Sequence, residues 1–352
     1  MIRAILKKIK NNIGITDVKK ETKIKYFINK LNVDLLNFKK IDFRYIDTKQ
    51  FVDMPDTEPK VKLFIPKVGV TNRPHYIKIK DPFKNVLIDI LTFIKIFMPL
   101  EAKKRGLHMS RIERVLYSAQ RKQYENLSQY LKEIIYPLME KQNINECMIC
   151  LKGIYEKETD KNFSGKKGHE ILHIYEKAIF KNDNLKMFKG LGVYFMNACP
   201  CPQRWAIRKF YYKLKEKGYS EEEIYEIIKE APLESHTNRG IAKLFIENDT
   251  ISFKNLYEIL DSSVTIVREL LSGNDEHLFI REAHEKELFC EDVVRNIAYQ
   301  TIKYLNGKIN DDKRVFIKVE VDESIHFHNL YAEIKTTFRQ LKKSIQKDNE
   351  NI

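Results

Sequence analysis

Strand-like and helix-like segments alternate along this chain from residue 60 to residue 345, in two similar halves. Apolar residues at every second position over 60–70 and 315–321 are typical of strands with one buried face. Apolar residues three and four positions apart over 111–141 and 291–305 are typical of helices. Strands paired with helices in two halves predict an α+β fold built from a duplicated unit. The amino-acid sequence contains no clear repeat that proves the duplication.

The remaining segments continue the alternation of strands and helices. Ser220 followed by Glu223 is a capping-box pattern, which predicts that a helix starts there. The apolar run 86–100 predicts a core element, because Asp89 and Lys95 interrupt it and it is short for a membrane span. We further expect strands over 147–155, 188–198 and 241–246, a helix or strand over 171–180, a hairpin partner for the first strand over 76–79, and helices over 204–217, 220–230, 256–271 and 331–345.

Composition narrows the class of protein. Hydrophobic residues make up 43% of the 352, enough for a core, so a wholly disordered chain is excluded. A net charge of +14 favours an anionic partner such as nucleic acid, an acidic surface or a phosphorylated small molecule. No zinc-finger spacing, helix-turn-helix, Walker A loop or GxGxxG is present, so we expect no nucleic-acid partner. Five cysteines and no signal-peptide pattern favour a reduced, soluble, cytoplasmic protein without a membrane partner.

Three motifs combine side chains that can bind metal or move protons. Cys199-Pro200-Cys201-Pro202 places two thiols at a strand end, where they are soft metal ligands or inert parts of a buried turn. His236 and Arg239 share one short segment that ends in Gly240, which is a site or a polar loop. The segment from Glu323 to His328 holds a carboxylate and two imidazoles, suited to a metal or acid–base site or to a surface cluster.

Each of the other motifs has a structural interpretation as well as a functional one. Ser110 is a plausible N-cap, and Arg111 beside a helix N-terminus suits a phosphate. The CxxC formed by Cys147 and Cys150 lies in a strand-like run, where the two side chains point to opposite faces, so two core cysteines are expected. We read the pair His169 and His173 as structural, and the acidic pairs at 275–276 and 291–292 are typical of solvated surface.

Taken in order, the motifs resemble the prokaryotic GTP cyclohydrolase IB family, including its archaeal methanopterin branch. The resemblance spans residues 50–342. It implies an α+β fold of tandem tunnelling-fold units over 46–190 and 191–352, each an antiparallel sheet with helices on one face, preceded by a Lys-rich extension, 1–45. It also implies a homotetramer with active sites at subunit interfaces. The matching pieces are Thr57-Glu58-Pro59, Val68–Asn72, Gly106–Arg111, Ala198–Cys201, His236–Gly240, Asp275-Glu276, Phe289–Asp292 and Glu323–His328.

The resemblance implies a reaction as well. The family opens the guanine ring of GTP and releases formate to give a 7,8-dihydroneopterin phosphate, as the triphosphate or the 2′,3′-cyclic phosphate, at the first step of folate or methanopterin synthesis. It uses one divalent metal per site, Fe(II), Mn(II) or Zn(II). By resemblance, the metal ligands are Cys199, His236, Glu276 and His326, the catalytic residues are Cys199, Glu291 and His326, and the substrate-binding residues are Glu323, Arg111, Arg239, Ser110 and His108.

Four positions depart from the family pattern. Thr237 and Asn238 stand where the family has Asn-Gln, Met54 stands where it has Gln, and Arg281 stands where an acidic residue is expected. Two alternatives stay open. One is another tunnelling-fold enzyme that acts on a pterin or deazapurine, with Glu323 as the anchor. The other is a basic RNA-binding protein that uses residues 1–45.

Overall fold

The computed structural model describes residues 53–159, 162–230, 234–248, 250–270 and 272–349. The chain divides into two compact units, Met1–Thr57 and Glu58–Ile352. Of the first unit only 53–57 is described, and it contains the 3-10 turn η3 (Met54–Asp56). The predicted extension 1–45 lies outside the described residues. The second unit contains the sheet and the helices of the described chain.

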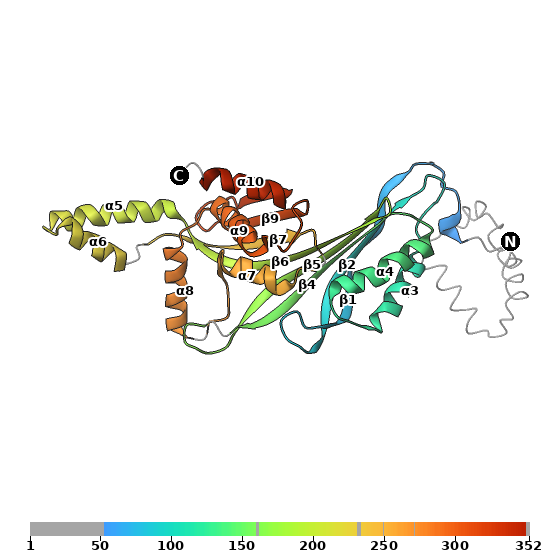
Figure 1. Ribbon diagram of the computed structural model, residues 1–352, viewed down its shortest axis with the longest axis horizontal. Coiled ribbons are helices and arrows are strands. Elements are labelled where there is room, and N and C mark those ends of the chain that lie inside the picture. Colours follow the sequence, from blue (N-terminus) through green and yellow to red (C-terminus); the bar gives the residue numbers. More distant parts are fainter. Residues whose placement is uncertain (1–52, 160–161, 231–233, 249, 271, 350–352) are drawn as a thin grey trace, which may run out of the picture. The chain divides into compact units, whose positions relative to one another are not determined.

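One large sheet organises the second unit (Figure 1). Its strands follow the order β10-β9-β7-β6-β5-β4-β2-β1-β3, with β8 paired to β6. All pairs are antiparallel except β1 with β3. The strands are β1 (Ile65–Lys80), β2 (Leu87–Leu100), β3 (Gln123–Tyr124), β4 (Cys147–Thr159), β5 (Gly168–Lys181), β6 (Asn184–Ala198), β7 (Thr237–Ile246), β8 (Thr265–Ile266), β9 (Arg314–Asp322) and β10 (Leu330–Thr337).

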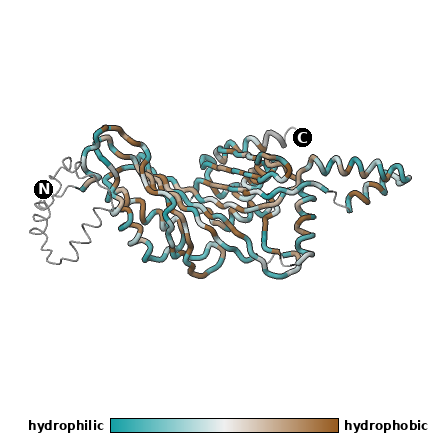
Figure 2. The backbone as a smooth tube through the Cα atoms, turned by 180° about the vertical axis from the view of Figure 1, so that it is seen from behind, coloured by the Kyte–Doolittle hydropathy of each residue, from teal (hydrophilic) through white to brown (hydrophobic). Residues whose placement is uncertain are grey.

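Alternate residues of the strands point to a covered and to an open face of the sheet. On β2, Ile94 and Ile96 are buried, while Leu91 and Phe93, which precede them on the other face, are exposed. Figure 2 shows the resulting alternation of hydrophobic and hydrophilic residues along the backbone. The buried side chains form one continuous core with the helices. These are α3 (Met109–Gln120), α4 (Leu127–Gln142), α7 (Phe253–Asp261), α9 (Cys290–Leu305) and α10 (Phe338–Asn349), whereas α8 (Gly273–Glu285) buries Phe279 and Ala283 outside that core.

Two groups of four strands follow each other across the sheet. β1-β2-β4-β5 and β6-β7-β9-β10 each run in chain order, and each has helices between its second and third strand. The two groups meet at the β5–β6 hairpin, whose turn residues Asn182 and Asp183 both have positive φ. The expected α+β class with a large antiparallel sheet is therefore confirmed. The tandem tunnelling-fold units stay a prediction, and the boundary predicted after residue 190 falls inside β6.

Several predicted segments differ in the structure. The segments 60–70 and 76–79 are not a hairpin, because both belong largely to β1, and its partner is the apolar run that forms β2. The ambiguous segment 171–180 is strand β5. The predicted helix 256–271 ends at Asp261 and is followed by β8. The predicted helix 331–345 is a strand, β10, before it becomes α10 at Phe338.

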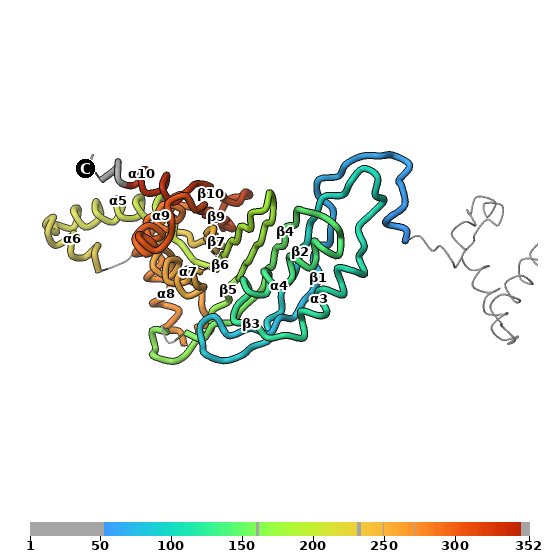
Figure 3. Tube along the Cα trace, turned by 45° about the vertical axis from the view of Figure 1, so that its right-hand side comes forward, coloured from blue at the N-terminus to red at the C-terminus, as the bar shows by residue number. Residues whose placement is uncertain are grey.

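Two helices are inserted between β6 and β7. They are α5 (Pro200–Glu216) and α6 (Glu221–Glu230), and they project from the rest of the unit (Figures 1 and 3). The capping box predicted for α6 is confirmed, since Ser220 N–H donates to Glu223 at 2.8 Å and Glu223 N–H donates to the Ser220 hydroxyl at 3.2 Å. Only Pro200, Gln203 and Leu214 of α5 are buried. Among the described helices, none has the length and apolar character needed to cross a membrane.

Candidate functional site

The ends of β6, β7 and β9 bring three predicted site segments together. Ala198 pairs with Thr237, so the residues that flank this pair, Cys199 and His236, lie side by side. The Cys199 N–H donates to the His236 carbonyl at 3.1 Å. Arg239 pairs with Asp322 on β9, which places Glu323 beside the same strand end. Antiparallel pairing thus joins the Cys-Pro-Cys-Pro, His236 and Glu323 motifs in one chain.

The His236 ring is held from its Nδ1 side. Nδ1 lies 3.2 Å from Glu323 Oε1, 3.2 Å from the Ser324 hydroxyl and 3.4 Å from Asn238 Oδ1. A histidine that binds a metal through one ring nitrogen typically donates from the other to a carboxylate. The arrangement therefore suits His236 as a metal ligand through Nε2.

Glu323 is the most enclosed carboxylate of this site, with 4% of its side chain exposed. Its Oε1 accepts from the backbone N–H groups of Ser324 (2.9 Å) and Ile325 (3.2 Å), and its Oε2 accepts from the Asn238 amide (3.0 Å). Burial alone would raise the pKa of this carboxyl, but these donors, together with His236, hold it below its ordinary value. Glu323 is thus an ionised acceptor whose hydrogen bonds are made within its own chain.

Cys199 is the N-cap residue of α5 and is partly buried. Burial is the main cause that raises the pKa of its thiol, and the negative charge of Glu323 adds to the effect. Ser235 holds the Cys199 carbonyl through its hydroxyl, so the backbone on both sides of the site is fixed. Cys201 lies in the first turn of α5 and is exposed.

The other two predicted metal ligands do not join this pair in one chain. His326 is exposed, and its ring stacks on His328 with 5.2 Å between centroids. Glu276 is exposed in the first turn of α8, whereas His284, near the other end of that helix, reaches Ser235 O at 3.3 Å. Glu276 precedes His284 by eight positions, about 12 Å along the helix axis. Within the described ranges, no three His, Cys, Asp or Glu side chains lie close enough to hold a metal ion. The fit to a metal is therefore limited to the Cys199–His236 pair.

Glu291, the predicted base, lies in the first turn of α9. Leu288, three positions earlier, donates its N–H to the Ala198 carbonyl at 3.2 Å, and its own carbonyl accepts from the Asn197 amide at 2.8 Å. These bonds attach the start of α9 to the end of β6, next to Cys199. The carboxylate itself is exposed.

The predicted substrate residues on α3 lie elsewhere. Figures 1 and 3 place α3 and α5 at opposite ends of the unit. The N-cap of α3 is His108, not Ser110, because the helix begins at Met109. His108 is buried, and its backbone N–H and carbonyl bond the Gln142 amide. Arg111 donates to the Lys141 carbonyl at 2.9 Å. Within one chain these residues do not reach His236.

Arg239 points away from the residues that surround Glu323. It lies on β7 between Asn238 and Gly240, which are both buried, while Arg239 is exposed. Successive strand residues point to opposite faces, so Arg239 points to the open face of the sheet and Asn238 to the covered one. The guanidinium is therefore on the other side of β7 from the Asn238–Glu323 contact.

Sequence reasoning missed residues that hold the site in place. Asn238, noted as a departure from the family pattern, bridges Glu323 and the Ser324 N–H through its amide. Ser324 and His284 contact the site only because strands and helices bring them there. Of the other departures, Met54 lies in η3 and Arg281 pairs with Glu285 at 2.7 Å on the surface of α8.

The two cysteines of the CxxC lie on β4, with Cys147 buried and Cys150 partly buried, as expected.

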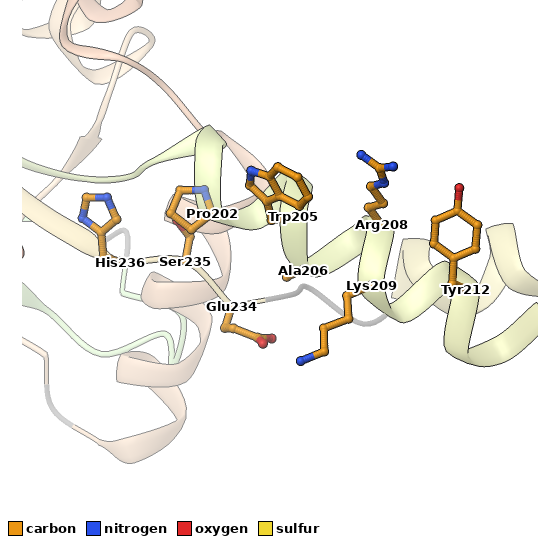
Figure 4. Close-up of a pocket in the computed structure, with 9 residues that line it drawn as sticks. All are labelled: Pro202, Trp205, Ala206, Arg208, Lys209, Tyr212, Glu234, Ser235 and His236. Atoms are coloured by element: carbon orange, nitrogen blue, oxygen red, sulfur yellow. The ribbon is translucent and has the colours of Figure 1, made fainter.

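A groove with a volume of about 670 Å³ begins at His236 and follows α5 (Figure 4). In Figure 4, Trp205, Arg208 and Tyr212 project from α5 on one side, and Lys209 on the other. Trp205 is 69% exposed. Ser235 and Glu234 complete the wall on the side of the segment that leads into β7.

Comparison with known proteins agrees with the motif order. The family model described as type I GTP cyclohydrolase folE2 matches residues 51–332. GTP cyclohydrolase MptA of Methanococcus aeolicus is 31% identical over 310 residues, which is 84% of this chain and 100% of the relative. MptA of Methanocaldococcus jannaschii is 29% identical over 306 residues, 83% of this chain and 97% of the relative. A solved hyper-thermostable AgUricase mutant, 7% identical, aligns with a TM-score of 0.42 over 78% of this chain and 91% of its own, too distant for any assignment. The chain belongs to the type I GTP cyclohydrolase folE2 family, a family of enzymes.

Proposed function

We propose that this enzyme opens the imidazole ring of the guanine in GTP, releases formate and diphosphate, and forms 7,8-dihydroneopterin 2′,3′-cyclic phosphate. The observation that carries the proposal is the meeting of Cys199, His236 and Glu323 from three distant segments at one end of β6, β7 and β9. Family membership supports GTP as the substrate. The similarity to relatives named MptA supports the cyclic phosphate of the methanopterin branch over the triphosphate.

The proposed site includes one divalent metal ion, Fe(II), Mn(II) or Zn(II). A thiolate and an imidazole are ligands that zinc and iron accept, and Cys199 and His236 supply one of each. His326 and Glu276 would complete the set, brought in by movement of their own segments or by a second subunit. When bound, the ion would supply positive charge that stabilises the negative charge formed during ring opening.

The chain's own side chains have separate roles in this proposal. Glu323 would accept the two N–H groups on the guanine edge, after its hydrogen bonds to the segment 324–325 are exchanged for the base. Adenine would leave the carboxylate unpaired, which selects guanine. Glu291 would take a proton from the water that attacks C8, and His326 would protonate the departing ring nitrogen. A second water then hydrolyses the resulting formamide, so that C8 leaves as formate and both nitrogens that flanked it remain on the pyrimidine.

Subunit assembly is part of the proposal, and the open face of the sheet supports it. That face exposes large apolar side chains on β2, β4, β5, β6 and β10. Large apolar side chains that gather exposed on one face are typical of a protein interface. We therefore propose a homotetramer with sites at its interfaces. The exposed side chains are Leu91, Phe93, Ile154, Ile171, Tyr194 and Tyr331.

The test uses purified protein, GTP and each of the three metals in turn, with formate and oxidised pterin fluorescence as the signals. We expect both signals, and a mass spectrum of the cyclic phosphate. Cys199→Ala should abolish turnover, whereas Cys150→Ala, a cysteine on β4, serves as the matched control and should retain it. Absence of formate with every metal would refute the proposed function. Equal activity of the two cysteine variants would refute the assigned site.

A further inference from the structure

The groove along α5 contains positively charged side chains that have no role in the reaction proposed above. Arg208 and Lys209 both line it, and in the described part of the chain neither forms an ion pair with a carboxylate. Glu234 is the acidic side chain among the described lining residues. The wall therefore has a net positive charge beside His236, and complements an anion.

Arg208 is held in place without being neutralised. Its guanidinium lies over the Trp205 ring, 5.4 Å from the centroid, and 6.0 Å from the centroid of Tyr212. A cation–π contact orients a guanidinium and leaves its full charge and its N–H donors for another partner. An ion pair with a carboxylate would instead occupy those donors. The aromatic pair therefore presents a prepared phosphate-binding group.

The position of the groove indicates that its anionic ligand is the phosphate chain of the nucleotide substrate. It starts at His236, whose ring contacts Glu323, the proposed guanine anchor. A nucleotide with its base at Glu323 extends its phosphates away from the base, and the groove leads away from the same point. Within one chain, Arg111 on α3 and Arg239 on the open face of the sheet do not line this groove.

We propose that the α5 groove binds the triphosphate of GTP, with Arg208 as the contacting cation and Trp205 as the residue that positions it. This inference rests on the proposed function and adds a substrate subsite to it. It also gives the inserted pair α5–α6 a role, because α5 is otherwise a mostly exposed helix with few buried residues.

The experiment uses the only tryptophan of the chain, Trp205, as a reporter inside the groove. Tryptophan emission of the full chain is followed during titration with inorganic triphosphate, which needs no turnover, and then with GTP and GMP. Arg208→Gln removes the charge in the groove. Arg204→Gln is the matched control, because Arg204 is on the same helix, is exposed and does not line the groove. Steady-state kinetics on GTP and GMP give a second readout.

We expect saturable emission changes in the wild type and in Arg204→Gln, and about tenfold weaker triphosphate binding in Arg208→Gln, the change that loss of one charged hydrogen bond gives. The KM for GTP should rise similarly while kcat and the KM for GMP change little. Arg208→Lys should restore part of the affinity.

Equal triphosphate affinity in Arg208→Gln and Arg204→Gln would overturn the inference. So would emission that responds to protein concentration and not to triphosphate, since a second copy of the chain would then cover the groove. These outcomes differ from failure of the proposed function. If the wild type releases formate and Arg208→Gln binds triphosphate as tightly as the wild type, only the role of the groove is refuted. If the protein binds triphosphate but releases no formate, only the proposed reaction is refuted.

Discussion

A buried histidine in the first half of the sheet makes stability depend on pH. His75 on β1 is 1% exposed. Its Nδ1 lies 2.9 Å from the Arg73 guanidinium, and its Nε2 lies 2.6 Å from the Tyr130 hydroxyl on α4. Glu113 on α3 binds Arg73 from the other side at 2.7 Å. Because the guanidinium can only donate, Nδ1 must be an acceptor, so the ring is neutral in the folded chain.

The size of the effect follows from the pKa. Burial first, and then the charge of Arg73, lower the pKa of His75 from 6.5 to about 4. Because the folded pKa is below the unfolded one, the stabilisation is present above pH 6.5 and is lost as pH falls toward 4. The full difference corresponds to about 3 kcal/mol, and about 2 kcal/mol of it is lost between pH 7 and pH 5.

The assay is chemical denaturation at pH 7 and pH 5. His75→Gln keeps an amide acceptor and donor but cannot titrate, so its free energy of unfolding should fall by about 2 kcal/mol less than that of the wild type. His328→Gln, in an exposed loop, should follow the wild type. Parallel pH dependence of the wild type and His75→Gln would refute the reasoning, whatever their absolute stabilities.

Three further variants test other parts of the structure. Asn238→Ala removes the amide that holds Glu323, so we expect a loss of about 1–3 kcal/mol in denaturation and a lower rate of formate release; unchanged values for both would contradict the bridge. Lys189→Met leaves buried Glu176 without the cation 3.4 Å away and should cost about 3–5 kcal/mol, much of which Glu176→Leu in the same chain should restore. Gly69→Ala places a Cβ 1.7 Å from the Ile96 carbonyl, so β1 must move, and a melting temperature equal to that of the wild type would exclude the close approach.

Much of the fold could be predicted from periodicity, and the errors have a physical cause. Ile334 fits two patterns, since it lies two positions from Ala332 along a strand and four positions from Phe338 along a helix. The sequence pattern cannot choose between them, and the eight-residue pairing of β10 with β9 decides for the strand. The same holds for Thr265 and Ile266, which pair with β6 after α7 has ended.

The family could be predicted from the order of the motifs, and that prediction is confirmed. The contact between Cys199 and His236 follows from the pairing of their strands, which the sequence did not specify. The role of Asn238 was hidden for the same reason, because a side chain that bridges two strands has no signature within its own segment. Metal binding by Cys199, His236, Glu276 and His326 stays a prediction.

Gly240 links the register of the sheet to the geometry of the site. A Cβ at this position would lie 2.7 Å from the Glu320 carbonyl on β9 and 2.7 Å from the Phe195 ring on β6. The absence of a side chain therefore lets β9 approach β7 where Gly240 pairs with Val321. Two residues earlier, the same pairing brings Asn238 to Glu323 at 3.0 Å. A shift of one residue would turn Asn238 to the other face of the sheet.

Gly240→Ala should therefore damage the site as well as the core. We expect a loss of about 1–3 kcal/mol, the usual cost of overpacking, together with a loss of GTP turnover that persists at temperatures where the variant is folded. Gly106→Ala is the matched control, because a Cβ there meets nothing within 4 Å and φ is not positive. If Gly240→Ala were as stable and as active as Gly106→Ala, the close approach of β9 to β7 could not be what holds Asn238 against Glu323.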